Sequence, residues 1–190
     1  MIPFSTAPNK ESCCDLLKRI RAYTKAPIGL LLYYNLLFQQ GDAVYATLKK
    51  IGVDAVLVVD LPLEESSAHE EMLKQHAIGC VQLIAPNSDD ARAKQLLARS
   101  TAFAYVISRF GTTGVSEKLS VALAPRINQL KTLSDCPLVV GFGVSNADQI
   151  KTIFEVGANG AIVGSQITKW MRDEDQATAK KYIEKLVKNS

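Results

Sequence analysis

The 190-residue sequence lacks several features that would mark a specialised class of protein. It has one tryptophan and two histidines, and aromatic residues make up only 7% of it. Its 22 basic and 19 acidic residues leave a net charge of +3, without the clustered basic surface typical of nucleic-acid binding. No apolar run reaches the roughly 18 residues that a membrane-spanning helix requires. We therefore expect neither a nucleic acid nor a membrane as partner.

The four cysteines have no spacing typical of a metal site. None forms a C-x-x-C pair, so we expect no zinc or other metal. Cys80 and Cys136 stand beside apolar runs and are predicted to be small core residues. Cys13 and Cys14 are adjacent and cannot easily bridge each other. Free thiols, and an N-terminus without a basic stretch followed by an apolar one, favour a cytoplasmic protein.

What the sequence does contain is an alternation of short apolar runs and amphipathic segments, within a composition that is 47% hydrophobic. The runs are nearly continuous in hydrophobicity, which indicates strands buried on both faces, as in parallel sheets. The predicted strands are 27–34, 55–60, 79–85, 103–108, 137–142 and 160–164.

The segments between the strands predict helices. Val44, Leu48 and Ile51 recur at helical spacing, and Gly52 is expected to end that helix. His69 and His76 fall on another predicted helix, where we expect them to face solvent without a chemical role. The basic stretch 180–188 is predicted to be the solvated face of a C-terminal helix. The expected helix caps are Asn87 or Ser88 and Ser145 or Asn146, and the expected buried face of the last helix is Tyr182, Ile183, Leu186 and Val187.

Strands alternating with helices fit either a closed barrel or an open doubly wound sheet. The dinucleotide type of open sheet carries G-x-G-x-x-G in its first turn, and no such motif occurs here. Glycines clustered after the last two strands favour a TIM (β/α)₈ barrel, with residues 1–190 as one domain. Such barrels typically need about 250 residues, so we expect roughly two strand–helix units to be absent from this chain.

The late glycines suggest a phosphate site. Gly141, Phe142 and Gly143 stand at the end of the fifth apolar run, and Gly164 and Ser165 stand at the end of the sixth. Glycine lets the backbone approach an anion closely, and the first N–H groups of a following helix point toward it. The alternative is that these glycines only close turns. Likewise, the segment 111–114 can be a lid over a site or a plain surface loop.

Five segments carry a resemblance to a known family: PIGLLLYYN (27–35), GVDAVLVVDLPLEES (52–66), AYVISRFGTTG (104–114), GFGVS (141–145) and GAIVGSQITK (160–169). Over roughly residues 12–188 the sequence resembles the tryptophan synthase alpha subunit. The most specific elements are LPLEES after a strand and S-R-x-G-x-T-G, taken together.

The resemblance implies a lyase of tryptophan biosynthesis that cleaves indole-3-glycerol phosphate to indole and glyceraldehyde 3-phosphate by a retro-aldol reaction. This reaction needs no metal or organic cofactor. The implied partner is the beta subunit, in an alpha2beta2 heterotetramer.

By the same resemblance, Gly114, Gly143, Gly164 and Ser165 would bind the phosphate. Tyr105 would lie beside a reacting carboxylate, and the lid residue Thr113 would contact a catalytic aspartate. Asn35 would face the beta subunit. The remaining expected substrate contacts are Tyr33, Asp60, Leu61 and Phe142. Each has a structural alternative: Asp60 could cap the turn at 62–66, and the tyrosines could be core aromatics.

The family's two catalytic carboxylates have no counterpart here. Residues 1–5 resemble the start of the family motif P-F-S-D-P-x-A-D-G-P, but residues 6–10 depart from its acidic part. Glu11 and Asp15 fall on a predicted helix and are not candidates. We expect the first strand–helix unit and most of strand two to be missing, as in a piece of a longer enzyme.

Two other interpretations remain open at this point. One is a catalytically inactive, truncated relative that binds a phosphate ligand or docks on a beta subunit. The other is a different phosphate-binding barrel, such as a histidine-pathway isomerase. The isomerase is disfavoured because the run 79–85 ends without the aspartate that such enzymes carry on their fifth strand.

Overall fold

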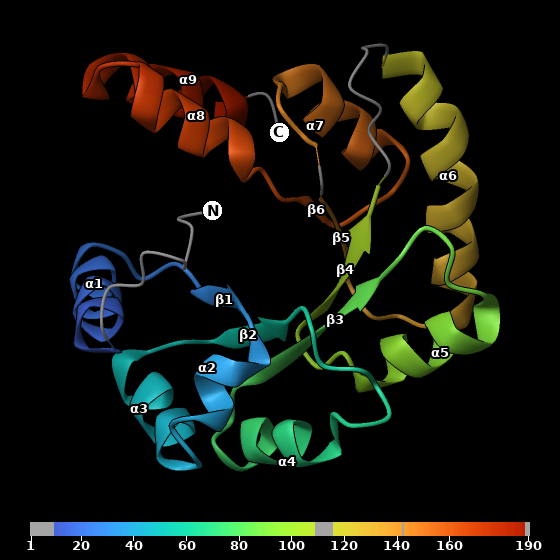
Figure 1. The fold of residues 1–190 in the computed structure, drawn as a ribbon. Coiled ribbons are helices and arrows are strands. Elements are labelled where there is room, and N and C mark those ends of the chain that lie inside the picture. Colours follow the sequence, from blue (N-terminus) through green and yellow to red (C-terminus); the bar gives the residue numbers. More distant parts are fainter. Residues whose placement is uncertain (1–9, 109–115, 142, 189–190) are drawn as a thin grey trace. The chain divides into compact units, whose positions relative to one another are not determined.

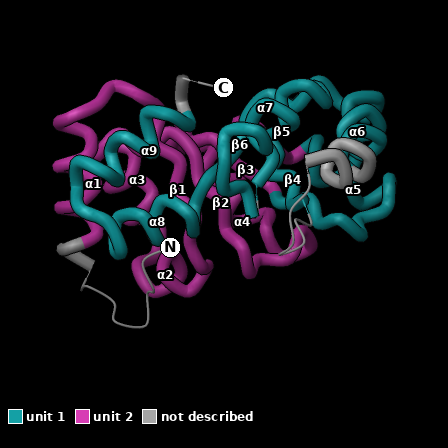
Figure 2. Tube along the Cα trace, turned by 90° about the horizontal axis from the view of Figure 1, so that it is seen from above, with its two compact units in different colours: residues 1–2, 83–98, 103–190 teal, residues 3–82, 99–102 magenta. Residues whose placement is uncertain are grey.

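The computed structural model describes residues 10–108, 116–141 and 143–188. The chain, drawn as a ribbon in Figure 1, divides into two compact units, which Figure 2 shows in different colours. The N-terminal unit comprises residues 3–82 and 99–102, and the C-terminal unit comprises residues 1–2, 83–98 and 103–190. No helix within the described ranges is long and apolar enough to cross a membrane.

The N-terminal unit is built from parallel strands separated by helices. Strand β1 pairs with β2, and β2 pairs with β3, with Gly29 opposite Ala55 and Ala55 opposite Gly79. Parallel neighbours need crossover connections, which the helices supply. The elements in chain order are α1 (Lys10–Tyr23), β1 (Gly29–Leu32), α2 (Tyr34–Phe38), α3 (Ala43–Ile51), β2 (Ala55–Val58), α4 (Ser67–Gln75) and β3 (Gly79–Ile84).

One face of these strands packs against helices α2, α3 and α4 (Figure 1). Leu32, Val56 and Cys80 come from the three strands, and Leu48 and Leu73 come from the helices that cover them. Burying a leucine such as Leu73, which is 1% exposed, contributes about 1.5–3 kcal/mol. This core fixes the strand ends from which the candidate residues of this unit project.

The C-terminal unit repeats the same plan. Strand β4 pairs in parallel with β5 and β5 with β6, with Ile107 opposite Gly141 and Val139 opposite Gly160. Its buried side chains include Val106 and Val140 from strands and Leu97, Ile127 and Ile153 from helices. The elements are α5 (Asp90–Arg99), β4 (Phe103–Ile107), α6 (Ser116–Leu133), β5 (Leu138–Gly141), α7 (Ala147–Glu155), β6 (Gly160–Ala161), α8 (Ser165–Asp173) and α9 (Gln176–Lys188).

All six predicted strands are confirmed, each shorter than its apolar run, and β1 and β6 are no more than half as long as predicted. Gly52 ends α3 with φ at +95°, the left-handed conformation that favours glycine. Asn146 caps α7, because its side chain accepts a hydrogen bond from the Gln149 N–H at 2.9 Å.

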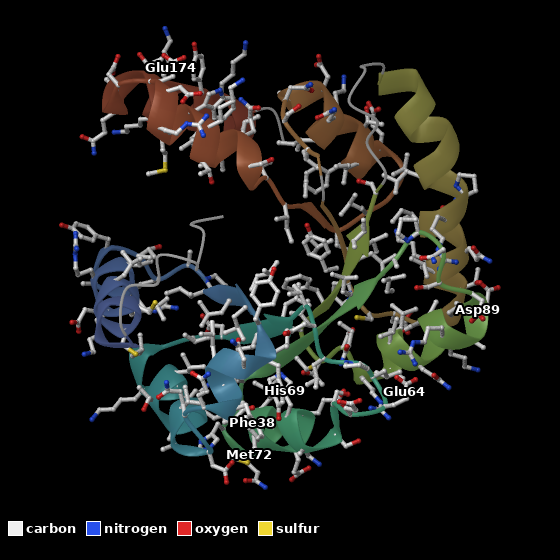
Figure 3. All side chains as sticks on the ribbon, viewed as in Figure 1. Phe38, Glu64, His69, Met72, Asp89 and Glu174 are labelled. Carbon is white, nitrogen blue, oxygen red and sulfur yellow. The ribbon has the colours of Figure 1, made fainter. Side chains whose placement is uncertain are left out.

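Three predictions, on the cap of α5, the burial of Cys136 and the buried face of α9, are wrong. Helix α5 is capped by Asp89, not by Asn87 or Ser88, because the Asp89 carboxylate accepts the Arg92 N–H at 2.7 Å (Figure 3). Cys136 is only half-buried, although Cys80 is a core residue as expected. In α9, Leu186 is buried but Tyr182 is 38% exposed, with its ring against Trp170 at the surface.

Candidate functional site

The turn after β5 is held at both ends. At one end the Gly141 carbonyl accepts two hydrogen bonds from Ser108, one from its N–H and one from its hydroxyl, both at 3.0 Å. At the other end the Ser145 N–H donates to the Gln149 side chain at 2.7 Å, just before α7 begins. Gly143, between the two ends, is exposed and has φ at +83°. A residue with a side chain is strained in that conformation, so the turn requires glycine.

Tyr105 packs directly against Gly141. An added Cβ on Gly141 would lie 3.0 Å from Cε2 of Tyr105 and closer still to its hydroxyl end. Tyr105 is 9% exposed, so its ring belongs to the interior of this unit. The ring and the Ser108 hydroxyl therefore fix Gly141 from the neighbouring strand β4.

The start of α8 is exposed and has no side-chain cap. Gly164 immediately precedes this nine-residue helix, and nothing lies within 4 Å of where its Cβ would be. Gly164 and Ser165 are both exposed. The first turn carries no acidic residue, and no side chain caps it. Free N–H groups and the positive end of the helix dipole favour a phosphate at this position.

Of the site residues predicted in this unit, the structure describes the supporting residue Tyr105 and the phosphate-binding residues Gly143, Gly164 and Ser165. Thr113, Gly114 and Phe142 lie outside the described residues. Within the described ranges no cluster of three or more His, Cys, Asp or Glu side chains could hold a metal ion.

The candidate residues of the N-terminal unit gather at the ends of β1 and β2. Tyr33 precedes α2 and is 46% exposed, and Asn35 is exposed on the first turn of that helix. The Asp60 carboxylate accepts the N–H of Tyr34 at 2.7 Å. Asp60 thus caps the start of α2 from the loop after β2, with its side chain still exposed. Leu61, the next residue, is half-buried.

A polar network that sequence reasoning missed holds the segment following Leu61. Ser66 is 2% exposed, and its hydroxyl lies 2.9 Å from the Leu63 carbonyl and 2.6 Å from a Glu70 carboxylate oxygen. The Arg99 guanidinium donates to the Leu63 carbonyl at 2.9 Å and to the Ser66 hydroxyl at 3.2 Å. The Gln82 amide donates to Glu70 at 2.9 Å. The motif LPLEES is therefore fixed by its last residue.

The expectation that His69 faces solvent is wrong. Its side chain is 4% exposed, and its Nδ1 lies 2.8 Å from the hydroxyl of Tyr45 in α3 (Figure 3). Burial lowers the pKa of His69 to about 4, against a smaller opposing effect of Glu70. Burial likewise raises the pKa of Tyr45 to about 12. The pair is neutral at physiological pH and serves to join α3 to α4.

Comparisons with known proteins agree on one family. The family model for the tryptophan synthase alpha chain matches residues 2–190. The alpha chain of Shewanella baltica is 38% identical over 171 residues, which are 89% of this chain and 63% of the relative. The Escherichia coli alpha chain is 37% identical over 168 residues, with 87% and 63% covered. The chain therefore spans about 63% of the length of these curated relatives.

Solved structures extend the likeness to the fold. An alpha2beta2 tryptophan synthase structure from Pyrococcus furiosus gives a TM-score of 0.88 at 31% identity, covering 97% of this chain and 76% of that one. The alpha subunit of Campylobacter jejuni gives 0.85 at 27% identity, with 96% and 73% covered.

The parallel strands, their crossover helices and these structural matches define a protein of the TIM (β/α)₈-barrel class. The described residues hold six of the eight strands of that class. The chain belongs to the tryptophan synthase alpha chain family.

Proposed function

We propose that this chain carries the phosphate- and indole-binding part of a tryptophan synthase alpha-type lyase. The reaction is the retro-aldol cleavage of indole-3-glycerol phosphate in tryptophan biosynthesis. The observation that carries the proposal is the pair of glycine turns in one unit, at Gly143 after β5 and at Gly164 before α8. Family membership supports the same substrate class.

The cleavage reaction has three chemical requirements. A proton must reach the indole ring carbon, a base must take the proton of the glycerol hydroxyl, and the indole nitrogen must be supported. The carbon–carbon bond then breaks, releasing indole and an aldehyde. No metal or organic cofactor is part of this proposal, because proton transfer alone balances the cleavage.

We assign the phosphate to Gly114, Gly143, Gly164 and Ser165. The open space at Gly164 and the uncapped start of α8 support the last two assignments. Tyr105 would lie beside the reacting carboxylate, and Thr113 would act from the lid. The remaining proposed substrate contacts are Tyr33, Asp60, Leu61 and Phe142.

The acid and base of the family are proposed to be absent from this chain. The absence of each group slows proton transfer roughly 10²- to 10⁴-fold. We therefore expect the 190 residues to bind the substrate well and to cleave it poorly.

The proposed partner is a tryptophan synthase beta subunit, in an alpha2beta2 complex. The Pyrococcus furiosus relative is described as part of such a complex, which supports the assignment. Asn35, exposed at the start of α2, would face that subunit. A cytoplasmic location is part of the same proposal, since all four cysteines are free thiols.

The test is a cleavage assay with indole-3-glycerol phosphate in the presence of a bacterial beta subunit. It is run on this chain and on the protein expressed from the complete reading frame. We expect equimolar indole and glyceraldehyde 3-phosphate from the complete protein, and substrate binding with little product from the 190-residue chain. If the complete protein yields neither product, the lyase assignment is wrong. Binding without cleavage by the complete protein would instead favour an inactive, phosphate-binding relative.

A further inference from the structure

Ser108 is a buried side chain that the proposed mechanism does not use. It immediately follows the last residue of β4, is 5% exposed, and donates its hydroxyl to the Gly141 carbonyl on β5. The Ser108 N–H already donates to that same carbonyl at 3.0 Å, which is sufficient to pair the two strand ends. The hydroxyl therefore adds a second hydrogen bond at one position, where the sheet itself requires only one.

This second hydrogen bond lies close along the chain to Gly143, a residue of the proposed phosphate site. Gly141 is the last residue of β5, and the exposed Gly143 stands two residues further along the chain. The far end of the turn is held by Gln149, whose side chain accepts both the N–H of Ser145, at 2.7 Å, and the hydroxyl of Ser145, at 3.1 Å. Gly143 therefore lies between two residues that are held by side-chain hydrogen bonds: Gly141, which is held by Ser108, and Ser145, which is held by Gln149.

We propose that Ser108 is a positioning residue for anion binding: its hydrogen bond to the Gly141 carbonyl sets the direction in which the turn presents Gly143 to a phosphate group. In this proposal Ser108 acts through Gly141 and not by contact with the phosphate or the reacting atoms. An anion site made of backbone N–H groups depends on their fixed orientation, because each contributes little when it can turn away. This inference rests on the proposed phosphate site.

The experiment titrates inorganic phosphate into the isotope-labelled chain and follows the amide signals of Gly143 and Gly164 by NMR. Four proteins are compared: the wild type, Ser108→Ala, Ser108→Thr and the control Thr152→Ala. Thr152 is also buried, and its hydroxyl also donates to a backbone carbonyl, that of Asp148 at 2.9 Å, but in the middle of α7. Melting temperatures show that each variant is folded.

We expect Ser108→Ala to raise the dissociation constant for phosphate about fivefold, the effect of one lost hydrogen bond. Ser108→Thr keeps a hydroxyl and should bind like the wild type, and so should Thr152→Ala. The amide signal of Gly143 should shift in Ser108→Ala even before phosphate is added.

Three outcomes would overturn the inference. If Ser108→Ala binds phosphate as tightly as the wild type, the hydroxyl does not position the turn. If Ser108→Thr or Thr152→Ala loses as much affinity as Ser108→Ala, the loss reflects general loosening of the unit. If the wild type itself shows no phosphate binding, the proposed phosphate site fails, and the role of Ser108 fails with it.

Discussion

The ring of Tyr105 on β4 occupies the space into which a side chain on Gly141 of β5 would project. The two residues are diagonal neighbours, because Tyr105 is opposite Val139 and Gly141 is opposite Ile107. Diagonal pairs on one face of a sheet are within reach of an aromatic side chain. The Tyr105 ring can therefore occupy this space only while residue 141 has no side chain.

Replacing Gly141 by alanine should destabilise the protein by about 1–3 kcal/mol, because the new methyl group and the Tyr105 ring cannot both fit. Tyr105→Leu should relieve part of that loss, so that the double variant is more stable than the sum of the two single changes predicts. Urea unfolding of the four proteins measures the coupling. Gly160→Ala is the control, since its added Cβ would make only an ordinary contact with Val139 at 3.4 Å. Strict additivity would contradict the prediction.

A bulky residue at Gly164 should weaken phosphate binding strongly without unfolding the chain. Nothing lies within 4 Å of the added Cβ, so Gly164→Leu should fold, yet its side chain would block an anion from the start of α8. Calorimetric titration with glycerol 3-phosphate should show at least tenfold weaker binding. Gly29→Leu is the matched control, because Gly29 also has open space around it and belongs to the other unit. Equal affinities in wild type and Gly164→Leu would remove α8 from the site.

Mild acid should destabilise the N-terminal unit through His69. The folded protein holds the pKa of His69 at about 4, whereas the unfolded chain has the ordinary value of 6.5. The unfolded state therefore binds more protons between these values, so stability is complete above pH 6.5 and falls as the pH drops toward 4. The loss attributable to this one group is about 3 kcal/mol.

The comparison of wild type with His69→Gln isolates that contribution, because glutamine does not titrate. Urea unfolding at pH 7, 5.5 and 4.5 should show a steeper decline for the wild type. Parallel pH profiles for the two proteins would contradict the prediction.

Ser66→Ala should cost about 1–3 kcal/mol of unfolding free energy, because it leaves Glu70 without the hydroxyl that lies 2.6 Å away. Ser67→Ala is the natural control, since Ser67 is the next residue and is exposed. Thermal unfolding of the two variants decides the matter. A loss from Ser67→Ala as large as that from Ser66→Ala would mean that the buried network is not the cause.

Cys80 should resist alkylation in the folded protein. It is 5% exposed, and burial raises the pKa of its thiol to about 12, so very little thiolate forms at neutral pH. Iodoacetamide followed by peptide mass mapping should label the half-buried Cys13 and Cys14 before Cys80. In urea all of these thiols should react. Prompt labelling of native Cys80 would contradict its place in the core.

The sequence predicts the elements well because their signals are local. Apolar runs mark the strands, Gly52 marks a helix end through its left-handed backbone, and Asn146 marks a helix start through its short polar side chain. The glycine turns of the candidate site are local in the same sense. Each can be recognised within a few residues of chain.

The sequence does not reveal hydrogen bonds between residues that are far apart along the chain. Ser66 and Arg99 are 33 residues apart, and so are Ser108 and Gly141. One feature of the sequence could have predicted the burial of His69. It stands four residues before Leu73 and therefore shares the buried face of α4. Its burial depends on the Tyr45 hydroxyl as a partner, and only the fold shows that such a partner is present.

Helix α8 has no buried residue anywhere along its length. A helix so weakly anchored opens at small cost, and its amides should exchange with solvent faster than those of α7, whose Ile153 is fully buried. An anion bound at Gly164 stabilises only the helical state of α8 and must slow that exchange by mass action. Occupancy of the candidate site can then be read as hydrogen-exchange protection along α8, even when no turnover takes place.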